Sequence, residues 1–267
     1  FSRYSVDAEW SIPHFEKMLY DNGPLLALLA DAWTVTRAPL FARVAAQTAE
    51  WVMREMQDRS GENPGGYYSS LDADSEHEEG KFYVWTREEV QALLSEGEYA
   101  AAAAHWGLDS PANFEATHWH LRVTCPVETL AQRLGLGEER CAALLESSRS
   151  KLFAARERRV RPGRDEKILT SWNALMIGGM ARAGAVFGRT QWIESARRAL
   201  DFIRATLWRD GRLLATCKDG RAHLNAYLDD HAFLLAAAIE LLQADFRPDT
   251  LEFAGDLADA LLDRFED

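Results

Sequence analysis

Three pairs of adjacent helical segments place the strongest constraint on the fold of this 267-residue chain. In each pair, an apolar segment is followed after a short turn by an amphipathic one. A helix that is apolar all round is covered on every side, whereas an amphipathic helix keeps one face in water. The pattern therefore predicts two helical layers. The inner layer comprises residues 13–35, 171–187 and 229–244, and the outer layer comprises residues 39–57, 190–208 and 249–265.

The region at about 60–170 is expected to be an insertion between the first and second pairs. Helical periodicity recurs in it at 87–95, 97–106 and 138–157. Two segments rich in β-forming residues flank an acidic stretch, which predicts a β-hairpin over 66–85. The expected fold is therefore mainly α: an (α/α) toroid or barrel of helical hairpins with a small β-hairpin insertion. No low-complexity linker interrupts the chain, so residues 1–267 are expected to form a single domain.

The composition excludes several classes of protein. The net charge is −12, which argues against binding to nucleic acid or to an anionic membrane surface. No apolar run approaches the roughly 20 residues of a membrane span. The three cysteines are scattered and form no CxxC motif. They are expected to be free thiols in a reducing compartment, which predicts a cytoplasmic protein.

A polar set lies at the start of the first helical segment, within residues 11–22. Pro13 suits the first turn of a helix, where the missing N–H is not needed. In a helix that begins there, His14, Lys17 and Asp21 fall on one face, at i, i+3 and i+7. This arrangement indicates an imidazole, an amine and a carboxylate facing a cleft. The alternative is a solvated surface stripe.

Three further polar clusters lie beside aromatic residues or before apolar helices, at 71–76, 165–173 and 227–231. Parallel inner helices have their N-termini at one end, where free N–H groups favour carboxylates and polar ligands. The clusters are therefore expected to meet in one cleft. Its candidate catalytic residues are His14, Asp72, Asp74 and Asp230. Its candidate substrate-binding residues are Lys17, Asp21, Asn22, Trp85, Asp165, Lys167, Trp172, Asn173, Tyr227 and Asp229. Because buried charges must be paired, the two lysines are expected to contact these aspartates.

Carboxylates among aromatic side chains suit a sugar, since aromatic faces stack on its C–H surface and carboxylates bind hydroxyl groups or move protons. A calcium loop is a poorer match to the acidic run, because His77 and Tyr83 stand where that loop needs glycine and glutamate. The alternative interpretation of the acidic residues at 71–76 is a solvated hairpin loop.

No metal site and no cofactor are predicted. The histidines at 105, 118 and 120 have no acidic or cysteine partner at ligand spacing. The motifs of nucleotide-binding proteins, serine hydrolases and zinc proteases do not occur in the sequence.

Five motifs together resemble the spermatogenesis-associated, thioredoxin-domain-containing family. They are Tyr4–Asp7, Pro13–Asn22, Leu71–Glu76, Gly80–Trp85 and Lys167–Asn173. The resemblance implies a thioredoxin-like domain followed by an (α/α)₆ barrel of the six-hairpin glycosidase type, similar to the N-acylglucosamine 2-epimerase fold. This chain is expected to be the central part of that barrel, without the thioredoxin-like domain and the final hairpins. Six hairpins need twelve helices and about nine are predicted, so an open ring with exposed apolar surface is expected.

The sequence departs from the family pattern at two positions. Glu166 stands where an aspartate is common, and His231 stands where a tyrosine is common. The second departure weakens any assignment of His231 as a catalytic base.

The leading functional prediction is a carbohydrate-active enzyme that acts on a sugar or other small molecule. A glycoside hydrolase would pair Asp72 or Asp74 with Asp229 or Asp230. A sugar 2-epimerase would use His14 as its base. The alternative is a non-catalytic scaffold that binds a partner or client protein and is attached to a thioredoxin-like domain.

Overall fold

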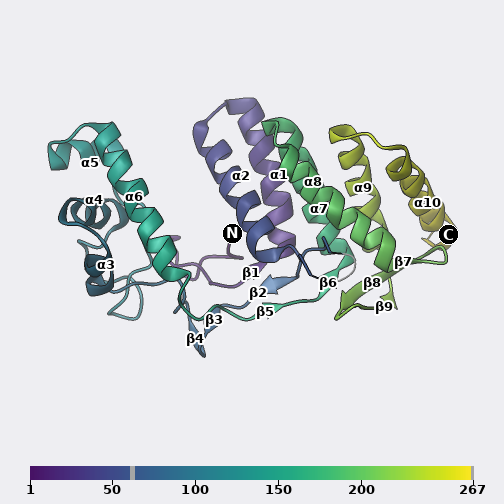
Figure 1. The fold of residues 1–267 in the computed structure, drawn as a ribbon, viewed down its shortest axis with the longest axis horizontal. Helices are drawn as coiled ribbons and strands as arrows, with labels where there is room; N and C mark the ends of the chain where they lie inside the picture. Colours follow the sequence, from purple (N-terminus) through teal and green to yellow (C-terminus); the bar gives the residue numbers. More distant parts are fainter. Residues whose placement is uncertain (61–63, 266–267) are drawn as a thin grey trace. The chain divides into compact units, whose positions relative to one another are not determined.

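The computed structural model describes residues 1–60 and 64–265, which form two compact units (Figure 1). Of the described residues, unit 1 comprises Phe1 and residues 17–60, 64–71 and 164–265, and unit 2 comprises residues 2–16 and 72–163. No helix among the described residues is long and apolar enough to cross a membrane. That the whole chain forms a single domain stays a prediction.

Unit 1 contains three helical hairpins in two layers, as the sequence predicted. Helix α7 packs against α1, α8 and α9, whereas α2 packs against α1 and α10 packs against α9. The inner helices are α1 (Leu19–Thr36), α7 (Thr170–Phe187) and α9 (Leu228–Ala244). The outer helices are α2 (Pro39–Trp51), α8 (Thr190–Phe202) and α10 (Pro248–Phe265). A π-helical turn extends each of the first two outer helices, η1 (Val52–Met56) and η2 (Ile203–Leu207). This confirms a mainly α fold built from helical hairpins.

Two glycines allow α1 and α7 to approach each other closely. A Cβ atom added to Gly179 would lie 2.2 Å from the carbonyl oxygen of Gly23, and one added to Gly23 would lie 2.5 Å from the carbonyl oxygen of Leu175. Real Cβ contacts are not that short, so the two backbones touch where side chains normally separate helices. This contact fixes the distance between the first two inner helices.

The first inner helix begins six residues later than the sequence predicted. Its N-cap is Met18, and residues 13–16 are not helical. Pro13 instead forms a β-bridge with Ser5, and Phe15 is buried in unit 2. Because residues 12–14 pair with residues 4–6 instead of forming a helical turn, the prediction that His14, Lys17 and Asp21 share one helix face was wrong.

Short strands lead into the inner helices of unit 1. A three-stranded antiparallel sheet has the order β1-β2-β5, and a second sheet joins β6 to the β7, β8 and β9 ribbon. The first sheet consists of β1 (Lys17–Met18), β2 (Ser70–Leu71) and β5 (Arg164–Asp165). The second consists of β6 (Ile168–Leu169), β7 (Trp208–Arg209), β8 (Arg212–Lys218) and β9 (Arg221–Asn225).

The β-hairpin predicted over 66–85, with one strand on each side of the acidic stretch, was wrong. Residues 70–71 pair with β1 and β5 instead, and a smaller hairpin lies within the acidic run of unit 2, formed by β3 (Asp74–Ser75) and β4 (Glu78–Glu79). The residues at its turn, Glu76 and His77, both have positive φ values, of 54° and 65°. The acidic run is therefore a tight turn rather than a long connecting loop.

Unit 2 is otherwise helical. Its helices are α3 (Arg87–Leu93), α4 (Glu96–Trp106), α5 (Val127–Leu134) and α6 (Glu138–Arg156). A capping box begins α3, since Thr86 and Glu89 each bind the other's backbone N–H. The sequence did not predict α5. Its amphipathic stretch is only eight residues long and follows a proline.

The three cysteines, Cys125, Cys141 and Cys217, are buried and free, as predicted. Large apolar side chains remain exposed on two of the three inner helices, Leu28 and Val35 on α1 and Phe233 and Ile239 on α9. All of α7 is described, and none of its large apolar side chains is exposed. Among the described residues, the exposed large apolar side chains of the inner helices therefore lie on the two helices that pack against one inner neighbour.

Candidate functional site

The first residues of the three inner helices meet at one end of unit 1. The backbone N–H of Ser171, in α7, donates to Oδ1 of Asp230, in α9, at 2.9 Å. The rings of Tyr20, in α1, and Trp172, in α7, pack edge to face with their centroids 4.7 Å apart. Both rings are partly exposed. This end of the layer therefore combines the N-termini of three helices with an accessible aromatic pair.

Asp230 holds two of these helix starts together. Its Oδ2 accepts a second hydrogen bond, also 2.9 Å, from the backbone N–H of Tyr227. The side chain is 3% exposed, and burial raises the pKa of this carboxyl group above its ordinary value. Both oxygens are used by backbone groups that a helix start leaves without an intrahelical partner. The arrangement makes Asp230 a bridge between α7 and α9.

Two buried amides from the candidate set have backbone partners as well. Asn173 accepts from the N–H of Tyr67 at 2.7 Å and donates to the carbonyl oxygens of Tyr67 and Leu169, each at 2.9 Å. Asn22 donates to the carbonyl oxygen of Met18 at 2.8 Å. These side chains fix the segments that lead into α1 and α7.

The remaining candidates of unit 1 are more accessible. Lys167 lies 2.9 Å from Asp165, which is one of the lysine–aspartate contacts expected from the sequence. Lys17 lies in β1 opposite Leu71. Asp21 is in the first turn of α1, and Tyr227 and Asp229 are exposed at the start of α9.

His14 lies in unit 2, among carboxylates that the sequence analysis did not select. Its Nδ1 lies 4.0 Å from Oε2 of Glu16, and its Nε2 lies 4.0 Å from Oε1 of Glu79. The ring stacks on Tyr4 with 4.8 Å between centroids. Nδ1 is buried without a hydrogen-bond partner among the described residues. Arg3 pairs with Glu16 at 3.0 Å and balances one of the two negative charges.

Three other candidates also belong to unit 2. Asp72 and Asp74 are exposed, and the Asp72 carboxylate accepts from the N–H of Asp74 at 3.3 Å. Trp85 is 5% exposed and forms a β-bridge with Trp119, with the guanidinium of Arg159 4.0 Å from its ring centroid. Its faces are covered by protein, so Trp85 is a core residue rather than an open stacking surface.

The sequence analysis missed Tyr20, Glu16 and Glu79. Each lies inside or next to a motif that had been identified, but the assumed helix over 13–22 and the assumed hairpin over 66–85 hid their neighbours. In the described part of the chain, no three His, Cys, Asp or Glu side chains are grouped to hold a metal ion.

No family model matches the chain. The chain is 35% identical to spermatogenesis-associated protein 20 of Homo sapiens over 293 residues, which cover 97% of this chain and 37% of that protein. The Mus musculus protein of the same name is 34% identical over the same shares. A crystal structure of a sugar epimerase from a ruminal bacterium matches 99% of this chain and 80% of its own chain, at 12% identity and a TM-score of 0.34. The chain thus spans little more than a third of the length of the curated relatives it matches. Over almost all of its own length, it is homologous to a segment of spermatogenesis-associated protein 20, as its motifs predicted.

Proposed function

We propose that this chain is part of a carbohydrate-active enzyme that moves a proton at a sugar carbon, as a sugar 2-epimerase does, with His14 as the base. The observation that supports this most is the surroundings of the His14 ring. Each ring nitrogen lies 4.0 Å from a glutamate carboxylate, and the ring stacks on Tyr4. Imidazole is the side chain suited to taking up and releasing a proton near neutral pH.

The proposed step conserves atoms and charge. The imidazole of His14 takes the proton from the carbon beside the carbonyl of an open-chain sugar, and the C–H electron pair forms an enediolate. Rotation about the C2–C3 bond then turns the opposite face of the enediolate towards the imidazolium, which returns the proton to C2, inverts that carbon and becomes neutral again. Glu16 and Glu79 stabilise the imidazolium while it exists, because opposite charges at this distance attract.

A glycoside hydrolase is supported less well. It needs a carboxylic acid and a carboxylate on either side of the bond, and the acid requires a raised pKa. Among the candidate catalytic residues, burial raises the pKa of Asp230. Both oxygens of that carboxylate, however, bind backbone N–H groups at helix starts. The group is therefore not free to protonate a leaving group.

The test is proton exchange in D₂O. The full chain is incubated with reducing aldoses, and ¹H NMR follows both loss of the C2 proton and appearance of the C2 epimer. We expect His14→Gln to slow exchange by roughly 100-fold or more, as loss of a general base does. His223→Gln, at an exposed position in β9, is the matched control and leaves exchange unchanged.

The scaffold alternative predicts a different result. A chain that binds only a protein partner shows no exchange with any aldose and no effect of His14→Gln. That pair of results would reject the epimerase proposal.

A further inference from the structure

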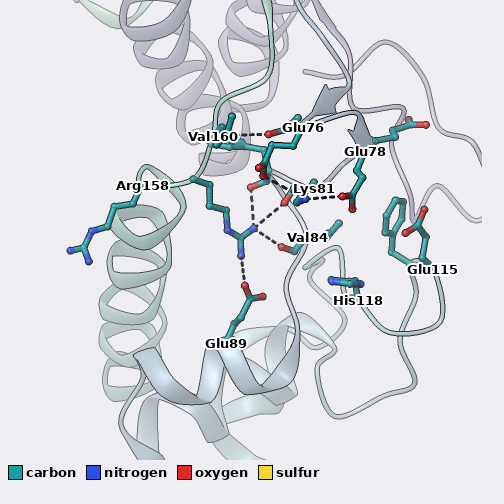
Figure 2. Close-up of a pocket in the computed structure, with 14 residues that line it drawn as sticks. Glu76, Glu78, Lys81, Val84, Glu89, Glu115, His118, Arg158 and Val160 are labelled. Atoms are coloured by element: carbon teal, nitrogen blue, oxygen red, sulfur yellow. Dashed lines mark hydrogen bonds and ion pairs between the residues drawn. The ribbon is translucent and has the colours of Figure 1, made fainter.

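A cavity of about 440 Å³ opens in unit 2 beside the hairpin β3–β4 (Figure 2). Its walls come from that hairpin, residues 81–84, the loop 114–118 and residues 158–160 after α6. Two phenylalanines, Phe82 and Phe114, contribute apolar surface. Five acidic side chains line it: Glu76, Glu78, Glu79, Glu89 and Glu115.

Two basic side chains of this cavity already have partners. Nζ of Lys81 lies 2.7 Å from Glu78 and 3.5 Å from Glu76. Arg159 lies 3.3 Å from Glu89 and donates to three backbone carbonyl groups of the segment 81–84. The side chain of Arg158 points away from the other labelled residues (Figure 2). The cations at the cavity are therefore paired or directed elsewhere.

Two carboxylates of the lining are left without a lysine or arginine partner among the described residues. Glu115 is exposed on the loop 114–118, and the Glu79 side chain, on β4, is 46% exposed with His14 at 4.0 Å. Glu115, His118 and the labelled glutamates of the hairpin lie around the same opening (Figure 2). The charge available to a ligand is thus negative, beside aromatic rings that also attract a cation.

We propose that this cavity binds the protonated amino group of an amino sugar, with Glu79 and Glu115 as its acceptors. The inference rests on the proposed function, because Glu79 belongs both to the cavity and to the surroundings of His14. An ammonium group bound there is attracted by both carboxylates, neither of which has a lysine or arginine partner among the described residues, whereas a sugar acid adds a third negative charge. No metal-holding group of side chains competes for this role among the described residues.

Three probes that differ in charge test the proposal: glucosamine, glucose and glucuronate. Each is titrated into the ¹⁵N-labelled chain, and the backbone amide shifts of residues 75–82 and 114–118 report binding at the cavity. We expect glucosamine to bind roughly fivefold more tightly than glucose and glucuronate to bind most weakly, as for a partly exposed charge pair. Raising the salt concentration reduces the preference for glucosamine, because exposed charges are screened.

Variants assign the effect to particular side chains. We expect Glu115→Gln and Glu79→Gln, singly and together, to lower the affinity for glucosamine towards the affinity for glucose. Glu88→Gln removes an exposed glutamate of α3 that does not line the cavity, and it leaves the preference unchanged. Equal affinity for glucosamine and glucose, tightest binding of glucuronate, a preference that survives the double variant, or no binding at all would each overturn the proposal.

His14→Gln separates this inference from the proposed function. Loss of proton exchange with an intact preference for glucosamine supports both. A preference for glucosamine in a chain that never shows exchange supports the cavity and rejects the epimerase. Exchange without any preference for glucosamine rejects the cavity and leaves the epimerase in place.

Discussion

Asp230 of α9 accepts a 2.9 Å hydrogen bond from the backbone N–H of Ser171 in α7, so one carboxylate connects the starts of two neighbouring inner helices. The same side chain caps its own helix through Tyr227. Two segments that the sequence analysis treated as parts of a reacting site, residues 165–173 and 227–231, are thereby tied together structurally.

Removing that carboxylate is expected to destabilise unit 1. Asp230→Ala leaves two partly buried backbone N–H groups at helix starts without their acceptors, which costs about 1–3 kcal/mol in the free energy of unfolding. Asp230→Asn keeps one acceptor oxygen and costs less. Urea unfolding of the full chain measures both values. A change below about 0.5 kcal/mol for Asp230→Ala would contradict the bridging role.

The raised pKa of Asp230 gives a pH dependence with a definite sign. Burial raises the pKa in the folded state above that of the unfolded chain, so the folded state binds the proton more tightly. The contribution of this group to stability is therefore present below the unfolded pKa, near 4, and is lost as the pH rises through the folded pKa. Comparing Asp230→Asn with the natural chain by urea unfolding at several pH values isolates this term. If the natural chain instead gained stability relative to Asp230→Asn as the pH rises, the pH dependence would have the opposite sign and the prediction would fail.

The close approach of α1 and α7 predicts different outcomes at two adjacent glycines. Gly179→Ala places a Cβ atom 2.2 Å from the carbonyl oxygen of Gly23, so we expect a loss of about 1–3 kcal/mol or more from overpacking. Gly178→Ala is the matched control, because its nearest neighbour is 4.0 Å away. Alanine favours a helix over glycine by about 0.8–1 kcal/mol, so the control keeps or raises stability. Thermal unfolding compares the two, and equal melting temperatures would argue against backbone contact.

A buried polar network in unit 1 predicts coupling between two hydroxyl groups. The hydroxyl oxygens of Tyr67 and Ser195 lie 2.7 Å apart, and the Ser195 hydroxyl also donates to Oε1 of Gln57 at 2.9 Å. Tyr67→Phe and Ser195→Ala are each expected to cost about 1 kcal/mol. Because they share one hydrogen bond, the double variant is expected to cost less than their sum. Strict additivity in a double-mutant cycle would show that the two groups act independently.

Substitution of Arg159 is expected to loosen the segment 81–85 of unit 2. It donates to the carbonyl oxygens of Lys81, Phe82 and Val84 and covers the ring of Trp85. Lysine lacks the planar fork needed for these contacts, so Arg159→Lys is expected to speed amide hydrogen exchange over 81–85. Arg158→Lys, at an exposed neighbouring position, is the control. Unchanged exchange in Arg159→Lys would mean that the segment is held by other contacts.

The sequence predicted the helical layers well because their signal is local. Residues 171–187 were expected to be helical, and the helix spans 170–187. That segment is mostly apolar, as expected for a helix that packs against three others, α1, α8 and α9. The shared end of the inner helices also followed from the order of helices along the chain.

The errors lie where segments form β-type pairings that the helical and hairpin patterns do not indicate. Pro13 indicated a helix start by local rules, but its bridge to Ser5 and the burial of Phe15 hold residues 13–16 out of the helix. The β-forming residues before the acidic run pair with 17–18 and 164–165, which no local pattern identifies. The surroundings of His14 depended on both of these pairings, so Glu16 and Glu79 could not be recognised as its neighbours.

The uneven exposure of apolar side chains on the inner helices has a consequence for cooperativity. In a row of hairpins, the middle member is stabilised by two interfaces and the outer members by one each, as in repeat proteins. The exposed Leu28 and Val35 on α1, and Phe233 and Ile239 on α9, mark the sides with one interface. Unfolding of unit 1 is therefore expected to begin at the first hairpin, α1–α2, or at the last, α9–α10, and to reach α7–α8 last. The amides of α7 and α8 should then exchange most slowly.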